Sequence, residues 1–255
     1  AATWGEPLEI TEIVAIGGKS DGKSTLLEAL LGFRFNVRDV EMGTRRPLVL
    51  QMKTCEDAEE PRCSLQEEDS DEYGEAIMPA SSVAEVIRQR TETLLKKTGE
   101  AVSSKPIVMR AEYKYSPNLT IIDTPGLIIK SRGGEPENTP EVIKAMVKEQ
   151  IAPQNRLILF LQQSTVEWAS SVWFDVVKEV DPRLQRTVFV ASKFDNRLKE
   201  FTEKWEIDQY LSASGYLGSC NPFFVALPKE RNITSNEHFR KLIYDTDASI
   251  RKKMR

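Results

Sequence analysis

The 255-residue sequence predicts an α/β protein with a doubly wound, mostly parallel central sheet and helices on both of its faces. Three observations support this fold class. Short apolar runs rich in β-branched residues recur along the chain, helical patterns separate many of them, and a glycine-rich turn joins the first run to the first helix. Because several runs are apolar throughout, we expect both faces of the sheet to be covered.

The expected strands are short and rich in valine, isoleucine and phenylalanine, which favour the pleated geometry of a strand. They are IVAIG (13–17), LVLQM (48–52), IVMRAEY (107–113), LTIID (119–123), LILFL (157–161), TVFVA (187–191) and FFVAL (223–227). Their alternation with helical segments is typical of βαβ units, in which crossover helices connect parallel strands.

Two segments carry helix start signals. In SSVAEVIRQRTETLLKK (81–97), Ser82 and Glu85 have the spacing of a capping box, and apolar residues follow along one helical face. In TPEVIKAMV, Thr139 is the expected cap and Pro140 the first helical residue. We therefore predict a helix after each signal.

Residues 53–81 interrupt this alternation with the acid-rich stretches EDAEEP and QEEDSDEYGE. Such clustering could suggest a calcium loop, but the EF-hand spacing with its central glycine and terminal glutamate is absent. We therefore expect a solvated acidic insertion.

The composition argues against several functional classes. A formal net charge of -4 gives no general affinity for nucleic acid or anionic lipid. No apolar run approaches the roughly 20 residues that span a bilayer. Three cysteines without CxxC spacing and a single histidine disfavour a disulfide framework and a zinc site, and a reducing cytoplasm fits best. We expect His238 on a helix surface rather than as a catalytic base.

The glycine-rich turn carries the strongest functional signal. Residues 17–24 read GGKSDGKS and satisfy G-x-x-x-x-G-K-[ST] between an apolar strand and a helix. In this arrangement backbone N–H groups surround phosphates, Lys23 meets the β- and γ-phosphates, and Ser24 offers its hydroxyl to Mg²⁺. The predicted phosphate-binding residues are Gly17, Gly18, Lys19, Ser20, Asp21, Gly22, Lys23, Ser24 and Thr25.

A phosphate loop does not select the base, so an ATPase, a kinase and a GTPase all remain open at this point. A second motif, Asp123-Thr124-Pro125-Gly126, ends the run LTIID. It places a carboxylate at the carboxyl end of a strand, where it acts on Mg²⁺ through water. The N–H of Gly126 is then placed to sense the γ-phosphate.

The third motif is SKFD (192–195), which follows TVFVA and matches [NT]KxD except for its first serine. The Asp195 carboxylate would accept from N1–H and the 2-amino group of guanine, a donor pair that adenine lacks, and Lys193 lies beside it. The three motifs in this order predict a GTPase with a sheet of the P-loop GTPase type. Because Leu127 follows Gly126, the glutamine with which many small GTPases orient water is missing.

These motifs together resemble the GTPase domain of the dynamin superfamily. The likeness is carried by GGKSDGKS, MGTRRPLVLQ (42–51), NLTIIDTPG (118–126), KEVDPRLQRT (178–187) and SKFDN (192–196). VEMGTRRPL, KFDNRLKEF and YLSASGYLG are most similar to the plant and algal dynamin-related proteins that divide plastids.

The likeness covers about the whole chain. It implies one dynamin-type GTPase domain over residues 1–255, cut from a longer mechanochemical protein. Residues 237–255 are expected to form a helix that leads toward a stalk outside this chain.

The resemblance also implies how water is activated. Ser20 would help hold the attacking water and a charge-compensating monovalent cation, Na⁺ or K⁺. Thr44 would position the water and bind Mg²⁺ with Ser24 and, through water, with Asp123. Dimerisation across the nucleotide face would order both switches, and Glu167 matches an acid that faces the partner. The implied catalytic residues are Ser20, Lys23, Thr44 and Gly126.

Several positions depart from the family pattern. Lys19 and Asp21 stand where typical dynamins have glutamine and alanine, so Lys19 either supplies part of the cation's charge or pairs with Asp21. Asp39 and Glu41 align with glycines of the cation loop. Lys229 follows FFVALP in place of an asparagine-arginine pair that stacks on the base, and its apolar stem is the expected cover for guanine.

Other positions allow two readings or lose an expected contact. Arg45 and Arg46 suit either an arginine finger or an anchor of the switch-one strand, and the anchor is favoured. Trp168 suits either an interface or the core. Leu198 aligns near an acid that reaches the partner's nucleotide in dynamins, which puts that contact in doubt.

We therefore expect hydrolysis of GTP to GDP and phosphate with Mg²⁺, stimulated by homodimerisation and without a nucleic-acid partner. In the full-length protein the resemblance implies constriction or fission of an organelle membrane in plastid division. The expected place is the cytosolic surface of the plastid outer envelope. Membrane association and higher assembly would come through regions outside this chain. The alternative is a GTP-dependent scaffold with little turnover.

Overall fold

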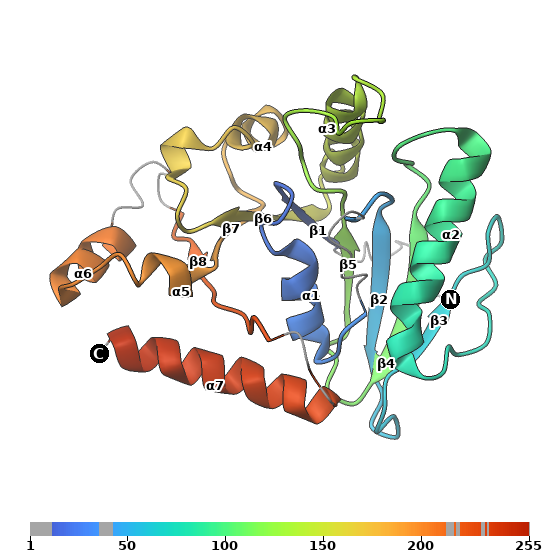
Figure 1. Cartoon of the computed structure of the whole chain (residues 1–255), viewed down its shortest axis with the longest axis horizontal. Helices are drawn as coiled ribbons and strands as arrows, with labels where there is room; N and C mark the ends of the chain where they lie inside the picture. The colour runs from blue at the N-terminus through green and yellow to red at the C-terminus, as the bar shows by residue number, and fades with distance from the viewer. Residues whose placement is uncertain are drawn as a thin grey trace, which may run out of the picture.

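The computed structural model describes residues 12–35, 43–212, 217, 220–230, 233 and 235–254, so Asp39 and Glu41 lie outside the described residues. Within them, eight strands form one sheet in the order β3-β4-β2-β5-β1-β6-β7-β8 (Figure 1). The strands are β1 (Glu12–Gly17), β2 (Leu48–Thr54), β3 (Arg62–Leu65), β4 (Ile107–Tyr113), β5 (Leu119–Asp123), β6 (Arg156–Gln163), β7 (Thr187–Ser192) and β8 (Phe223–Phe224). Two pairings, β2 with β5 and β3 with β4, are antiparallel and the others are parallel, which confirms the mostly parallel sheet.

Helices cover both faces of this sheet, as the sequence predicts (Figure 1). They are α1 (Lys23–Leu31), α2 (Val83–Thr98), α3 (Thr139–Ile151), α4 (Phe174–Val180), α5 (Phe194–Arg197), α6 (Lys204–Ser212) and α7 (Asn236–Met254). None of the described helices is long and apolar enough to cross a membrane.

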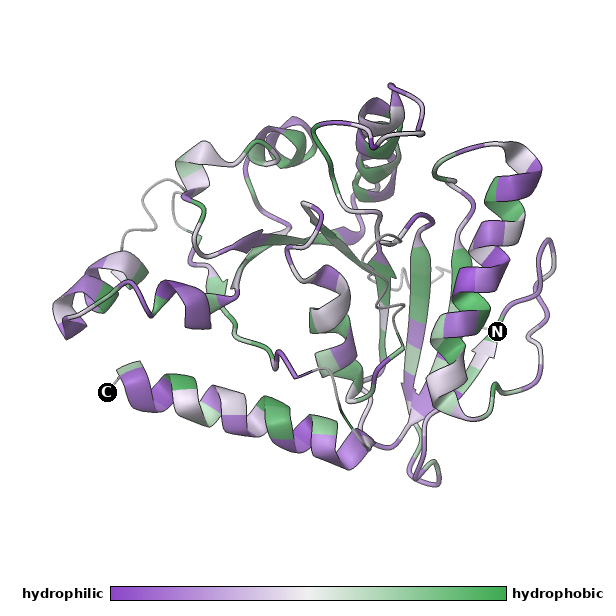
Figure 2. Ribbon diagram, viewed as in Figure 1, coloured by the Kyte–Doolittle hydropathy of each residue, from purple (hydrophilic) through white to green (hydrophobic). Residues whose placement is uncertain are grey.

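Strand β1 shows how alternating side chains build two cores. Ala15 points to one face, where it joins apolar side chains of α1 and α2, whereas Val14 and Ile16 point to the other and join those of α3 and α4. The apolar colouring of the central strands and the mixed colouring of α2 and α7 in Figure 2 follow from this arrangement. Residues buried on both faces explain why the central runs lack an apolar-polar alternation.

A third, smaller core lies at the β8 edge of the sheet. Phe194 of α5 packs with Tyr210 of α6 and Phe224 of β8, and Ile250 and Met254 of α7 close the cluster. This cluster fixes the segment that follows β7, which carries the predicted guanine motif.

The predicted helix caps are wrong in detail. Ser82 makes no capping hydrogen bond, because it ends a 3-10 turn (Ala80–Ser82) in a helical conformation rather than the extended one of a cap. Glu85 accepts from Arg88 and Gln89 on the exposed side of α2 instead of reaching back to Ser82. Thr139 is already inside α3, and its hydroxyl donates to the carbonyl of Pro136 at 2.7 Å. The helices themselves form, since their apolar faces are buried against the sheet.

The acidic segment 53–81 is more ordered than a solvated insertion. It contains β3, which extends the sheet by pairing with β4, and Cys63 and Leu65 are fully or almost fully buried. Its acids lie mainly at the surface, where Lys105 bridges Glu68 and Asp69. At the opposite edge the predicted run 223–227 forms only the two-residue strand β8.

The loops that carry the predicted site residues lie at one edge of the sheet. β1, β5, β6 and β7 run parallel, so the loops at their carboxyl ends meet there. Because β2 runs antiparallel to β5, with Leu48 beside Asp123, the residues that precede β2 arrive at this same edge. We refer to it below as the nucleotide edge.

Candidate nucleotide-binding and hydrolysis site

The phosphate loop connects β1 to α1 at the nucleotide edge. Gly22 begins the helix with φ of 92°, a left-handed conformation that glycine adopts without strain. Lys23 is buried, and its Nζ donates to the carbonyls of Gly17 and Gly18, each at 3.1 Å. Burial lowers the pKa of Lys23, whereas the charges of Asp123 and Asp21 raise it. The ammonium therefore sits at the centre of the loop.

The loop is also joined to the DTPG segment. The N–H of Lys19 donates to the carbonyl of Leu127 at 3.0 Å, and the N–H of Leu127 donates to the carbonyl of Gly17 at 3.0 Å. A Cβ on Gly126 would lie 2.8 Å from the Cα of Lys19, so only glycine permits this approach. The two phosphate-sensing segments are therefore held side by side.

Asp123 is the centre of the predicted Mg²⁺ site. Its Oδ2 accepts from Ser24 Oγ at 2.7 Å and from Thr44 Oγ1 at 3.4 Å. Burial raises the pKa of Asp123, and Lys23 and the two hydroxyls oppose that rise. Its Oδ1 is buried and makes no hydrogen bond to the described residues. One carboxylate and two hydroxyls provide the oxygen ligands that Mg²⁺ prefers, so these residues fit the ion.

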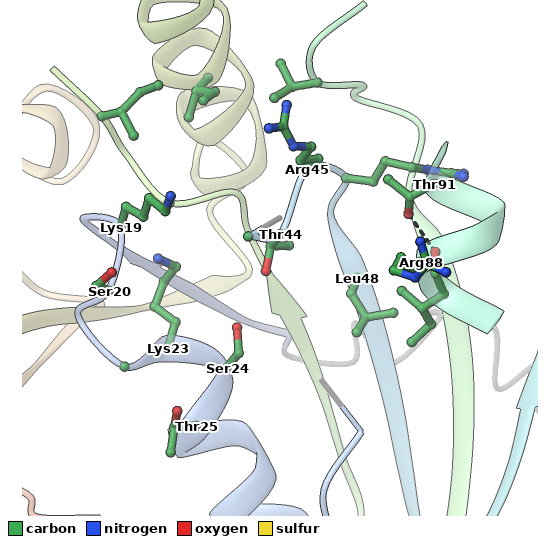
Figure 3. Close-up of a pocket in the computed structure, with 18 of the residues that line it drawn as sticks. Lys19, Ser20, Lys23, Ser24, Thr25, Thr44, Arg45, Leu48, Arg88 and Thr91 are labelled. Atoms are coloured by element: carbon green, nitrogen blue, oxygen red, sulfur yellow. Dashed lines mark hydrogen bonds between the residues drawn. The ribbon is translucent and has the colours of Figure 1, made fainter. Parts of the chain in front are cut away.

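A cavity of about 490 Å³ opens beside these groups. In Figure 3, Lys23, Ser24 and Thr44 face its interior from the phosphate loop and from the segment before β2, and Lys19 reaches over it. Residues at the loop side of the cavity are Lys19, Ser20, Gly22, Lys23, Ser24, Thr25, Gly43, Thr44, Gly126 and Lys193. The cavity thus brings together most of the predicted phosphate residues with Ser24 and Thr44 of the Mg²⁺ set, whereas Lys193 is the single predicted base residue that lines it.

The two readings of Lys19 can now be separated. Asp21 is buried and accepts from the N–H of Gly18 at 2.8 Å and from Gln163 Nε2 at 3.2 Å. Lys19 is exposed, and no ion pair joins it to Asp21. Pairing between the two is therefore not realised, and the end of the Lys19 side chain lies near Gly43.

The guanine motif is tied to the phosphate loop through its unusual serine. Ser192 Oγ donates to the carbonyl of Asp21 at 2.6 Å. Lys193 follows with φ of 54°, and Asp195 then lies in the first turn of α5. The Ser192 hydroxyl thus links the base motif to the phosphate loop. The sequence showed that position 192 departs from the [NT]KxD pattern, but it did not predict this hydrogen bond.

Asp195 already has a partner in this structure. Its Oδ2 lies 2.5 Å from Lys229 Nζ, and the same ammonium donates to Asn196 Oδ1 at 2.6 Å. The sequence placed Lys229 at the base but gave no sign of an ion pair with Asp195, because the two are far apart in the chain.

Arg45 and Arg46 serve as anchors. Arg45 pairs with Glu135 at 2.7 Å and donates to the carbonyl of Ala101. The Arg46 side chain is 1% exposed and donates to the carbonyls of Lys105 and Pro106, among others. These contacts leave Arg46 unable to act as an arginine finger and support the anchor interpretation.

Glu167 and Trp168 differ in their surroundings. Glu167 is exposed and pairs with Arg197 at 3.0 Å. Trp168 packs edge-on against Phe160 and Phe189, with ring centroids 6.0 and 5.5 Å away, so it is partly buried against the core. Trp173 was not anticipated from the sequence: its indole Nε1 lies 2.9 Å from where a Cβ on Gly18 would stand, so it covers the start of the loop.

The fold and site define a P-loop nucleotide hydrolase of the GTPase class. The chain belongs to the dynamin family, because residues 13–194 match the family described as "Dynamin family". It is therefore a dynamin-family GTPase domain.

Named relatives agree with this assignment. The chain is 62% identical over 256 residues to Dynamin-related protein 5A of Arabidopsis thaliana, covering 100% of this chain and 31% of that protein. It is 35% identical to Dynamin-like protein C of Dictyostelium discoideum, covering 88% and 29%, and 32% identical to Dynamin-like protein ARC5 of Arabidopsis thaliana, covering 97% and 34%. The chain thus spans about a third of the length of these relatives.

Proposed function

We propose that this domain hydrolyses GTP with the residues gathered at the nucleotide edge and that a second copy completes its active site. The observation that carries the first part is the convergence of Ser24, Thr44 and Asp123 beside the buried Lys23. On GTP binding, Lys23 exchanges the carbonyls of Gly17 and Gly18 for the β- and γ-phosphates.

Ser24 and Thr44 would contribute hydroxyl ligands to Mg²⁺, and Asp123 would act through water with its Oδ1, which has no hydrogen-bond partner among the described residues. Bound Mg²⁺ offsets negative charge on the phosphates. The fixed position of Asp123 at the end of β5 orients this ligand set before nucleotide arrives.

Leu127, the residue after DTPG, cannot orient the attacking water, so other side chains must do so. Leu127 is 2% exposed and both its backbone groups bond to the phosphate loop, so its side chain cannot reach the γ-phosphate. Ser20 and Thr44 line the cavity and are the groups we assign to the attacking water, with the N–H of Gly126 on the γ-phosphate. Lys19 supplies positive charge beside a monovalent cation, Na⁺ or K⁺, or in its place.

Exposed apolar side chains support dimerisation through the nucleotide face. Ile129 follows β5, and Val166 and Val172 follow β6, with 70, 41 and 56% of their surfaces exposed. All three lie on loops at the nucleotide edge, as does Glu167. Exposed apolar side chains on loops of one edge offer contact area to a second copy. Contact between two copies there would order the loops that carry Thr44 and Gly126.

In the full-length protein, we assign this turnover to constriction or fission of an organelle membrane at its cytosolic surface. The support is the resemblance of VEMGTRRPL, KFDNRLKEF and YLSASGYLG to dynamin-related proteins that divide plastids. Membrane association and higher assembly belong to regions outside this chain.

The test is phosphate release from GTP across a protein dilution series, with light scattering in GDP and in GDP with aluminium fluoride. We expect specific activity to rise with protein concentration and the fluoride complex alone to dimerise. A monomer with constant specific activity would refute the dimer requirement. Dimerisation with negligible phosphate release would instead support the scaffold alternative.

A further inference from the structure

The guanine-binding carboxylate is held by a basic side chain from a distant segment. Asp195 lies in α5, and Lys229 lies beyond β8, yet Lys229 Nζ is 2.5 Å from Asp195 Oδ2. The Lys229 side chain is 59% exposed and that of Asp195 is 21% exposed. The pair is therefore within reach of solvent ions and is not locked inside the core.

The carboxylate is closed to a base in this arrangement. Asp195 Oδ1 is buried and has no hydrogen-bond partner among the described residues, and Oδ2 is occupied by the ammonium. A guanine edge needs both oxygens, one for N1–H and one for the 2-amino group. The base can bind only after the ammonium withdraws from Oδ2.

We infer that the ammonium of Lys229 is an internal competitor of guanine, a latch that weakens nucleotide affinity and favours release. The inference rests on the guanine contact assigned to Asp195. When guanine binds, Asp195 loses its ion pair with Lys229 and gains hydrogen bonds from two neutral donors. The free energy of breaking the ion pair therefore reduces the favourable free energy of nucleotide binding. An uncharged side chain at position 229 would remove this competition.

Asn196 provides an alternative hydrogen-bond acceptor for the displaced ammonium of Lys229. Its Oδ1 already accepts from Lys229 Nζ at 2.6 Å, next to Asp195 in the same turn of α5. The ammonium can keep this contact while leaving Oδ2, and the apolar stem of Lys229 then remains beside the base. One side chain thus closes the site without nucleotide and covers guanine when it is bound.

The first test measures GDP affinity with Mg²⁺ by calorimetry for the 255-residue chain and for Lys229→Met, which keeps the apolar stem without the charge. The matched control is Lys199→Met, which makes the same change in net charge at an exposed lysine on the loop after α5. For a partly exposed ion pair, Lys229→Met should tighten GDP binding about two- to fivefold at low salt, and Lys199→Met should not. Weaker or unchanged binding in Lys229→Met would refute the latch.

Salt provides a second readout. Because ions screen a solvent-exposed pair, the difference between the wild-type chain and Lys229→Met should shrink toward zero as NaCl rises to about 1 M. A difference that stays constant over this range would mean that Lys229 acts through packing and not through its charge, and would overturn the inference.

A double-mutant cycle separates the latch from the guanine assignment. Asp195→Asn should prefer xanthosine diphosphate, and adding Lys229→Met to it should not alter that affinity, since the carboxylate partner is gone. An equal gain in both backgrounds would refute the latch while leaving Asp195 as the guanine contact. Unchanged guanine preference in Asp195→Asn would remove the contact on which the latch depends.

Discussion

At Lys23 the protein keeps a positive charge where burial disfavours it. Burial lowers the pKa of this lysine and raises that of Asp123, and the attraction between the two opposes both shifts. The carbonyls of Gly17 and Gly18 hold the ammonium until phosphates replace them. The site is thus assembled around charges whose unmet interactions a Mg²⁺-nucleotide satisfies.

Lys23→Ala should therefore abolish high-affinity nucleotide binding. The variant removes the ammonium centred on the phosphates, and backbone N–H groups cannot replace its charge, so we expect GTP affinity to fall by about 100-fold or more. Equilibrium binding of a fluorescent GTP analogue measures the loss, with Lys199→Ala as the exposed control. Near-normal affinity in Lys23→Ala would exclude the phosphate-loop assignment.

Ser20→Ala and Thr44→Ala test the roles in water positioning. Both side chains line the cavity, and we expect each variant to retain GTP binding while turnover falls about 100-fold, the usual cost of losing one transition-state contact. Single-turnover phosphate release at saturating GTP separates the two effects, with exposed Ser104→Ala as control. Equal losses in binding and rate would instead indicate a damaged loop.

The phosphate and Mg²⁺ residues were predictable from the sequence because local spacing places them. Lys23 and Ser24 follow directly from the loop pattern, and Asp123 from its place at a strand end. The Lys229 to Asp195 ion pair was not predictable, because it joins segments whose approach depends on the third core.

At the scale of elements, buried faces were predicted better than ends and edges. Each central strand appeared as an apolar run, since two covered faces demand it. Edge strand β3 was missed because it has only four residues and lies among acids. Ser82 failed as a cap because a 3-10 turn (Ala80–Ser82) precedes α2 and holds Ser82 in a helical conformation. A 3-10 turn joined to the start of a helix is hard to recognise in the sequence.

The position of Cys63 in strand β3 predicts how readily its thiol is alkylated. Cys63 has no exposed surface, and burial raises the pKa of its thiol to about 12. Because only the thiolate alkylates readily, Cys63 should resist iodoacetamide at pH 8 in the folded protein and react after unfolding in urea. Partly exposed Cys55 and Cys220 are internal controls, read by peptide mass spectrometry. Rapid native alkylation of Cys63 would mean that β3 opens easily from the sheet.

At the scale of the whole molecule, one edge of the sheet carries the candidate site and the surface that we propose for a second copy. The loops after β5 and β6 expose Ile129, Val166 and Val172 around the nucleotide edge, whereas Trp168 between them is partly buried against the core. Gly126 and Ile129 lie on the same loop after β5, whereas Ser20, Lys23 and Thr44 lie on neighbouring segments of the same edge. We therefore expect a partner that binds at Ile129 to bias the conformation of the loop that also carries Gly126.

Glu167→Lys tests this coupling. In one chain Glu167 pairs with Arg197, which also holds Glu200 at 2.6 Å. Charge reversal should weaken the dimer formed with GDP and aluminium fluoride about tenfold and lower turnover at high protein concentration, because a like charge at an interface is repulsive. Nucleotide affinity of the monomer should stay nearly unchanged. Glu200→Lys breaks the other contact of Arg197 and is the matched control. Sedimentation equilibrium measures the dimer in both variants, and equal weakening would trace the effect to Arg197, contradicting the partner contact assigned to Glu167.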